Sequence, residues 1–280
     1  MNKRKFRLAP LLLILLAALF ALPVLYTLAG SLMSPGEAAA RFHAAGPAFG
    51  KPYGPSLIPG VATLRQYYAL LVENYGYLGM FWNSMLYAAA ITLGANLFTI
   101  PLAYVFAKHR FKGSNVLFFV FLLTMMMPFQ VTLLPFYIML GRLELLGTAW
   151  SLILPSVFAP TGVFLLRQFL RGVPDELIEA ASLETNSALK ILVRIVVPSA
   201  KNGIIAMNIL IFAEAWNMVE QPLLFLRDAA KYPLSAAMNG IIASNLGVSF
   251  SGSVLFMAPI IVLYLCFEEQ IVEGLESFKW

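Results

Sequence analysis

Four polar side chains lie close together in a strongly apolar part of the chain, where they could bind a solute: Glu214, Asn217, Glu220 and Gln221. Glu214, Asn217 and Gln221 recur at i, i+3 and i+7, which places them on one face of an uninterrupted helix. Carboxylates and side-chain amides hydrogen-bond hydroxyl groups well, so this face is a candidate path for a hydroxyl-rich solute. A polar contact with a second membrane protein explains the same residues, and the sequence leaves both interpretations open.

The segment 167–202 holds a second group of polar residues, between two apolar stretches. Pro174 suits the first position of a helix because its missing N–H would be unpaired there in any residue. The carboxylates that follow it complement the helix dipole. We therefore expect a helix over about 174–183, a break at 184–187 and a second helix over about 187–196. Such an acidic helical segment could insert into a cleft of another protein, or it could be a solvated connector between two membrane spans.

The chain lacks the patterns that hydrolases and phosphate-binding enzymes use. No G-x-x-x-x-G-K-[ST], H-E-x-x-H or G-x-S-x-G pattern is present. The single cysteine, Cys266, lies in an apolar run and has no partner for an intrachain disulfide. His43 and His109 fall in different loops, which argues against a metal site. We therefore expect no catalytic residue, no metal and no cofactor in this chain.

The composition indicates which solvent surrounds these residues. Hydrophobic residues make up 60% of the chain and charged residues 12%, against about 25% charged in a soluble domain. A soluble fold of this size could not cover its surface with so few charges, whereas a lipid bilayer requires an apolar surface. The basic residues are scattered rather than clustered, so nucleic-acid binding is not expected. The sequence thus predicts an all-α membrane protein.

Six apolar stretches have the length of membrane-spanning helices, which need roughly 20 residues. They cover about residues 8–30, 81–107, 114–140, 149–166, 203–226 and 252–272. The first follows basic residues, as a signal peptide does, but it is too long and lacks a cleavage site, so we expect it to be retained. Within the third stretch, Met125-Met126-Met127-Pro128 indicates a kink. The predicted fold has six transmembrane helices, with a cytoplasmic helical segment between the fourth and the fifth.

The basic residues set the expected orientation. With both termini in the cytoplasm, 13 of the 19 lysines and arginines face inward, as the positive-inside rule requires. Residues 31–80 then form an external segment that begins irregularly with prolines and ends in an amphipathic helix over 67–79. Residues 167–202 form the one long cytoplasmic loop. We divide the chain into residues 1–80, the first helix with its external loop, and residues 81–280, a core of five helices.

Several motifs resemble those of the inner-membrane permeases of ABC importers, most closely the MalG type that serves carbohydrate importers. The cytoplasmic loop carries Glu179-Ala180-Ala181 followed by Ile195 and Pro198, which resembles the EAA motif of that family. Further matching motifs are Asn83-Ser84, Phe106-Ala107-x-x-Arg110-Phe111-x-Gly113, Leu146-Gly147-Thr148, Phe164-Leu165-Leu166-Arg167-Gln168-Phe169, Trp216-Asn217 and Val272-Glu273-Gly274-Leu275. An isolated EAA motif is a weak signal, but the full set occurs in order along nearly the whole chain.

The resemblance implies that the EAA segment holds a coupling helix that docks in a groove of a cytoplasmic ATPase. The residues assigned to this contact are Glu179, Ala180, Ala181, Glu184, Thr185 and Pro198. It also implies a second related permease, two ATPase subunits that hydrolyse the ATP, an external solute-binding protein, and a bacterial or archaeal inner membrane. Thr185 stands where the family usually has glycine, so we expect Asn186 to adopt the left-handed conformation of that turn.

The resemblance also implies the solute, a sugar or oligosaccharide that the external protein delivers. Permeases for glycerol-phosphate-type solutes share the same motifs, so that class stays open. An ion-coupled carrier, from another class of transporter, would need several paired charges inside its spans or broken helices in matching halves. Glu214 is the one charge well inside a predicted span, so the carrier is the weaker hypothesis.

Overall fold

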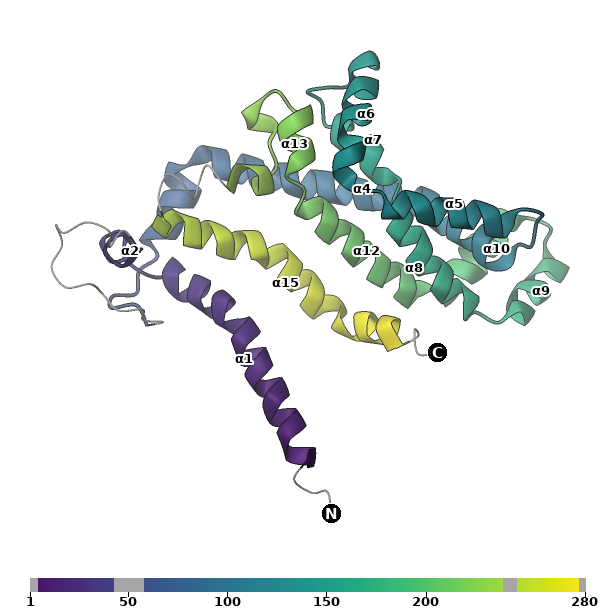
Figure 1. The fold of residues 1–280 in the computed structure, drawn as a ribbon, viewed down its shortest axis with the longest axis horizontal. Coiled ribbons are helices and arrows are strands. Elements are labelled where there is room, and N and C mark those ends of the chain that lie inside the picture. Colours follow the sequence, from purple (N-terminus) through teal and green to yellow (C-terminus); the bar gives the residue numbers. More distant parts are fainter. Residues whose placement is uncertain (1–4, 43–57, 239–245, 277–280) are drawn as a thin grey trace. The chain divides into compact units, whose positions relative to one another are not determined.

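The computed structural model describes residues 5–42, 58–238 and 246–276, and within these ranges it contains helices and turns but no strand (Figure 1). The prediction of an all-α fold is confirmed for this part of the chain. Several residues on which the predicted orientation depends, among them Lys3, Lys51 and Lys279, lie outside the described residues, as does His43.

Four helical segments are long and apolar enough to cross a membrane: Pro10–Ser31, Gly76–Lys108, Trp150–Arg171 and Gly247–Gln270. Two further segments meet the same criterion only as bent pairs. They are Ser114–Met126 with Phe129–Arg142, bent by 95°, and Ala188–Ser199 with Lys201–Trp216, bent by 83°. The described part of the chain therefore has four apolar spans, or six if each bent pair counts as one.

Three of the predicted spans are interrupted. The fourth breaks at Phe158 and Ala159, between α7 (Trp150–Val157) and α8 (Pro160–Arg171). The third breaks where the methionines and Pro128 indicated a kink, between α5 (Ser114–Met126) and α6 (Phe129–Arg142). The prediction of one helix through the fifth stretch is wrong, because α12 (Lys201–Trp216) ends at Trp216 and α13 (Glu220–Phe225) is a separate helix. The broken segments matter below because polar side chains gather at the breaks.

One compact unit consists of residues 1–79 and 237–259. Its helices are α1 (Lys5–Ser31), α2 (Pro35–Phe42), α3 (Arg65–Tyr68), the π-helix η1 (Ala69–Glu73) and the N-terminal parts of α4 (Tyr75–Lys108) and α15 (Leu246–Glu276). Tyr77 Oη donates a hydrogen bond of 3.0 Å to the carbonyl oxygen of Gly252. Gln66 Nε2 donates one of 3.3 Å to the carbonyl oxygen of Met33. Each of these buried bonds joins two segments that are distant in sequence.

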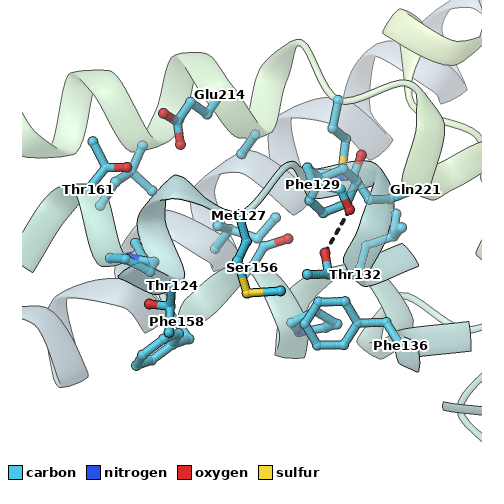
Figure 2. Close-up of a pocket in the computed structure, with 18 of the residues that line it drawn as sticks. Thr124, Met127, Phe129, Thr132, Phe136, Ser156, Phe158, Thr161, Glu214 and Gln221 are labelled. Atoms are coloured by element: carbon cyan, nitrogen blue, oxygen red, sulfur yellow. Dashed lines mark hydrogen bonds between the residues drawn. The ribbon is translucent and has the colours of Figure 1, made fainter. Parts of the chain in front are cut away.

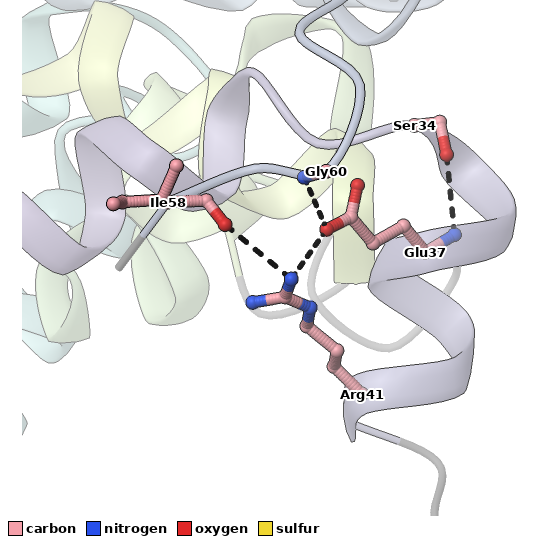
Figure 3. Close-up of polar contacts among 5 residues, drawn as sticks. All are labelled: Ser34, Glu37, Arg41, Ile58 and Gly60. Carbon is pink, nitrogen blue, oxygen red and sulfur yellow. Dashed lines mark hydrogen bonds and ion pairs between the residues drawn. The ribbon is translucent and has the colours of Figure 1, made fainter. Parts of the chain in front are cut away.

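The start of the external segment is more regular than its prolines suggest, since α2 occupies part of it. The side chains of Glu37 and Arg41, one helical turn apart, form an ion pair of 2.6 Å. Glu37 Oε1 also accepts a hydrogen bond of 2.8 Å from the backbone N–H of Gly60, and Arg41 donates to the carbonyl oxygen of Ile58 (Figure 3). The prediction of an irregular start is therefore wrong for α2, which this ion pair holds against the returning backbone.

The end of the external segment also differs from its prediction. The single amphipathic helix expected over 67–79 is divided among α3, η1 and the first turn of α4, with a break at Asn74. Leu70 and Tyr77 are almost fully buried. One side of the segment therefore packs against protein, while Tyr68 and Val72 on it remain exposed.

The second compact unit consists of residues 80–236 and 260–280. Besides α5, α6, α12 and α13, it contains most of α4 and the C-terminal part of α15. Its remaining helices are α7 (Trp150–Val157), α8 (Pro160–Arg171), α9 (Asp175–Glu184), α10 (Ala188–Ile191), the π-helix η2 (Leu192–Val196), α11 (Val197–Ser199) and the 3-10 helix η3 (Ala229–Lys231). Our sequence-based boundary at residue 80 remains a prediction about domains.

The closest helix packing in this unit joins α8 to α12, side by side in Figure 1. Glycines allow the approach: a Cβ added to Gly203 would lie 2.5 Å from the Phe169 ring. Small residues have this effect between membrane helices, which associate mainly through close packing. At the end of α12 the fully buried Trp216 stacks on Phe212, with ring centroids 5.8 Å apart, and meets the edge of Phe81.

The Asn83-Ser84 motif on α4 has a structural role. Asn83 Nδ2 donates to the carbonyl oxygens of Ala230 and Tyr232 at 2.9 and 3.2 Å. Ser84 Oγ is buried and accepts a hydrogen bond of 2.7 Å from the backbone N–H of Leu234. The two side chains satisfy backbone groups of the segment that contains η3 and the helical residues beginning at Leu234, and so hold that segment against α4.

Candidate functional site

A cavity of about 420 Å³ lies in the second unit, where three helix breaks meet (Figure 2). Residues from all three breaks line it: Met127 between α5 and α6, Phe158 and Ala159 between α7 and α8, and Met218 between α12 and α13. Helix breaks at membrane depth leave backbone N–H and C=O groups free of helical partners, and proteins keep them only where they line a cavity or are covered by protein. The convergence of the breaks marks this cavity as the candidate site.

Local sequence explains two of the breaks. Met127 adopts an extended backbone (ψ 128°) directly before Pro128, and Ala159 (ψ 87°) directly before Pro160. A residue before proline is disfavoured in the helical region because the proline ring contacts its backbone. At the third break, the Asn217 side-chain amide donates 2.8 Å to the carbonyl oxygen of Ala213 and so closes the end of α12.

The structure separates the four polar residues that the sequence grouped. Glu214 and Gln221 line the cavity, whereas Asn217 and Glu220 do not. Glu220 accepts a hydrogen bond of 3.3 Å from the Gln130 amide on α6. The expectation that Glu214, Asn217 and Gln221 share one helical face is wrong, because α12 ends one residue before Asn217.

Four hydroxyl groups in the cavity wall escaped the sequence analysis: Thr124, Thr132, Ser156 and Thr161 (Figure 2). Thr124 and Thr132 donate hydrogen bonds of 2.7 Å to carbonyl oxygens of their own helical turns, and each hydroxyl oxygen can still accept one from a solute. A usable signal existed, since Ser156 and Thr161 each directly follow a proline inside an apolar stretch. No lysine or arginine is among the described residues that line the cavity.

The EAA segment has the expected two helices, joined by a short break. Its first helix, α9, begins directly after Pro174, one residue later than predicted. Thr185 then adopts an extended backbone (φ −152°), and its Oγ1 accepts a hydrogen bond from the backbone N–H of Ser187. Ser187 Oγ accepts in turn from the Lys190 N–H and caps α10.

The expectation that Asn186 adopts the left-handed conformation is wrong. Among the described residues other than glycine, Glu144 alone has a positive φ. Side-chain caps at Thr185 and Ser187 make the turn with ordinary backbone angles, so no glycine is required there.

One face of α9 is exposed to solvent and the other is half-buried. Glu179 and Ala180 are exposed, and Leu183 is 90% exposed, an unusual state for a leucine. Ala181 and Thr185 are half-buried on the side that packs toward η2. Glu184 and Pro198, the remaining residues of the predicted contact, are exposed.

The start of α9 is fixed to the end of α4 by Lys108. Its Nζ donates hydrogen bonds to the carbonyl oxygen of Val173 and, at 2.6 Å, to Asp175 Oδ1. The hydrogen bond from Lys108, together with its charge, holds the pKa of the Asp175 carboxyl below the usual aspartate value. The Asp175 side chain is 69% exposed, so the pair contributes little to the stability of the fold and serves mainly to position α9.

We expect Lys108→Met to loosen the first turn of α9 and to speed amide hydrogen exchange there several-fold at pH 7, measured by mass spectrometry on the purified complex. A lowered pKa means that the ionised Asp175 is favoured in the folded state. The contribution of the Lys108–Asp175 pair is therefore fully present above the usual aspartate pKa, about 3.9. It is lost as the pH falls through the lowered pKa of Asp175. Asp175→Asn should abolish this acid transition. Unchanged protection in Lys108→Met would contradict the role of the pair.

Comparison with known proteins agrees with this architecture. Residues 99–274, which include α9 and nearly all of the cavity lining, match the family described as "Binding-protein-dependent transport system inner membrane component". The chain is 30% identical over 220 residues to the arabinooligosaccharides transport system permease protein AraQ of Halalkalibacterium halodurans, covering 78% of this chain and 79% of that protein. It is 30% identical over 230 residues to the sn-glycerol-3-phosphate transport system permease protein UgpE of Escherichia coli, covering 79% and 82%.

A solved structure shares the fold. It is the crystal structure of a bacterial ABC transporter involved in the import of the acidic polysaccharide alginate, with a TM-score of 0.78 and 20% sequence identity. The match covers 96% of this chain and 98% of that chain.

The apolar helices and the cavity at their breaks define a helical membrane permease of an ABC importer. This chain belongs to the family of inner-membrane components of binding-protein-dependent transport systems. The predicted resemblance is therefore confirmed, and the family is one of transport permeases rather than enzymes.

Proposed function

We propose that this chain is one permease subunit of an ATP-driven importer and that its cavity forms part of the path for a neutral, hydroxyl-rich solute, such as a sugar or oligosaccharide. The observation that carries the proposal is the cavity wall. It combines one carboxylate, one amide and four hydroxyls with no basic side chain among the described residues. Carboxylates, amides and hydroxyls exchange hydrogen bonds with sugar hydroxyls through both donors and acceptors.

The charge of the wall distinguishes between the solutes of the relatives. The names of two relatives specify arabinooligosaccharides and sn-glycerol-3-phosphate. A phosphate needs cationic partners or backbone N–H groups, whereas Glu214 is the one ionisable side chain among the described lining residues. The described wall offers no cationic side chain to balance a phosphate, so the cavity favours the neutral saccharide.

The broken helices support the same role. Interrupted transmembrane helices leave backbone groups without helical partners, and at membrane depth such groups are tolerated where they line a cavity, so a solute there can bind them. The breaks beside Pro128 and Pro160 both open on the cavity. Solute can therefore replace the missing helical partners.

The exposed face of α9 is the proposed contact with an ATPase subunit. Two such subunits would hydrolyse ATP, a second related permease would complete the path, and an external binding protein would deliver the solute. Glu179, Ala180 and Leu183 point away from the chain's own core, which suits insertion into a groove of another protein. The excess of basic residues in this and the other predicted inner loops supports a cytoplasmic location for α9 and for both termini.

The proposal is tested at Glu214. Glu214→Leu removes both charge and hydrogen bonding from the cavity wall, and we expect uptake of a labelled neutral oligosaccharide to fall about tenfold, equivalent to one hydrogen bond to a charged group. Glu214→Gln should have a smaller effect, because it keeps the shape and most of the hydrogen bonding. Glu220→Gln is the matched control, since Glu220 is a nearby carboxylate outside the cavity.

The results separate the alternatives. Normal uptake by Glu214→Leu in an assembled complex would contradict the role of the cavity. Loss of co-purifying second permease would place Glu214 at the subunit interface instead. Competition by sn-glycerol 3-phosphate as strong as that by the neutral oligosaccharide would contradict the proposed solute class.

A further inference from the structure

A second cavity, of about 670 Å³, lies where membrane-spanning segments end. The span Gly76–Lys108 ends at its wall, the span Trp150–Arg171 ends there, and α5 begins there. Figure 1 shows α5, the C-terminal half of α8 and α9 at one end of the second unit. Since the ends of membrane spans reach the polar region of the bilayer, we expect this cavity to lie at the level of the lipid headgroups.

The charges in this cavity are strongly unbalanced. Lys108, Arg110, Arg167 and Arg171 line it, with Asp175 as the one carboxylate among the described lining residues. Lys108 is paired with Asp175, which leaves three arginines with no described ion pair. Arginine guanidinium groups bind phosphates through several N–H donors at once, so the unpaired charge favours a phosphate.

One of these arginines is held in a fixed position. Arg167 Nε donates a hydrogen bond of 3.0 Å to the carbonyl oxygen of Phe106, and its guanidinium lies over the Phe118 ring, 3.8 Å from the ring centre. Arg110 and Arg171 are exposed at the mouth of the cavity. The N-terminus of α5 has no side-chain cap and adds partial positive charge to the same wall.

The surface beside the cavity is apolar. On α5, four large apolar side chains are each at least half exposed: Val116, Leu117, Phe119 and Val120. Phe111, at the rim of the cavity, is 41% exposed. A cationic cavity that continues into an apolar helix face matches a molecule with an anionic head and hydrocarbon tails. A free anion would contact the cavity but not the apolar face.

We propose that this cavity binds the phosphate headgroup of an anionic phospholipid, with the acyl chains along α5. Basic pockets between membrane helices recognise such headgroups through the same combination of charge and depth. The bound lipid lies against Lys108 and the start of α9, and so touches the segment proposed to receive the ATPase.

The test counts phosphatidylglycerol molecules that remain bound to the detergent-purified complex, by native mass spectrometry during titration with that lipid. We expect Arg110→Gln/Arg171→Gln to weaken binding about 30-fold, because each basic group near an anionic lipid contributes a several-fold factor. The double substitution by lysine should restore most of the binding. Lys112→Gln is the matched control, since Lys112 belongs to the same turn and does not line the cavity.

Three results would overturn the proposal. The first is equal phosphatidylglycerol binding by the wild type and the double glutamine variant. The second is an equal loss in Lys112→Gln, which would mean that general surface charge attracts the lipid. The third is full displacement of the lipid by millimolar inorganic phosphate, which would identify a free-anion site. Retention of phosphatidylglycerol over phosphatidylcholine, in the presence of phosphate, supports it.

Discussion

Leu183→Asp is expected to abolish solute-stimulated ATP hydrolysis and uptake while the two permeases still assemble. Leu183 is 90% exposed near the end of α9, so the substitution costs the isolated subunit little. If the open face of α9 inserts into an ATPase groove, the new carboxylate becomes buried without a partner. A buried polar group without a partner costs about 1–3 kcal/mol and a charged one more, which is equivalent to a loss in docking affinity of about 30-fold or more.

The measurement is co-purification of the ATPase with the permease pair, together with uptake in proteoliposomes. Ser182→Asp is the control, because it places the same charge on the adjacent residue of α9, about 100° around the helix. Equal losses in both variants would indicate that any charge on α9 is harmful, and would contradict a defined docking face. Full activity of Leu183→Asp would remove α9 from the coupling contact altogether.

The second large effect is expected at Trp216. Trp216→Ala leaves a cavity at the end of α12, where the indole stacks on Phe212 and is fully buried. Large-to-alanine substitutions of buried aromatic residues cost about 3–5 kcal/mol, mostly through lost packing contacts. We expect the unfolding midpoint of the complex in detergent to fall by roughly 10 °C, measured by thermal unfolding.

Trp82→Ala provides the comparison. Trp82 is 59% exposed on α4, where it meets the edge of Phe81. Lipid or detergent chains fill the space that its removal leaves, so the midpoint should change by no more than about 2 °C. A shift for Trp82→Ala as large as that for Trp216→Ala would mean that lipid contacts, rather than packing at the end of α12, determine stability.

The fold was largely predictable because its signals are local and strong. Long apolar runs predict helices without reference to any partner, and the methionines before Pro128 correctly located the break between α5 and α6. Pro174 likewise marked the start of α9 to within one residue. The chemistry of proline and of helix ends acts over a few residues, so sequence alone contains it.

The site was predictable only in part, because it depends on contacts between distant segments. Glu214 stood out as a charge in an apolar stretch, but the end of α12 at Trp216 could not be seen from the apolar pattern, which continues to residue 226. The proline before Thr161 was a usable signal for a break in the helix, but only the packing of α7 and α8 shows that the hydroxyl lines the cavity. The basic cavity beside Lys108 also joins segments some 60 residues apart, and no spacing rule connects them.

The turn between α9 and α10 has a mechanical consequence. A glycine at Thr185 would give the unfolded and the folded turn more backbone freedom, whereas the Thr185 side chain, which accepts one hydrogen bond, and Ser187, which accepts the next, restrict the turn. If α9 docks on an ATPase subunit as proposed, we expect a displacement of α9 to reach α10 and η2 with little loss in the turn. The 83° bend before Lys201 would then direct that displacement along α12, the helix that carries Glu214. The turn would act as a rigid connection between the proposed ATPase contact and the proposed solute path.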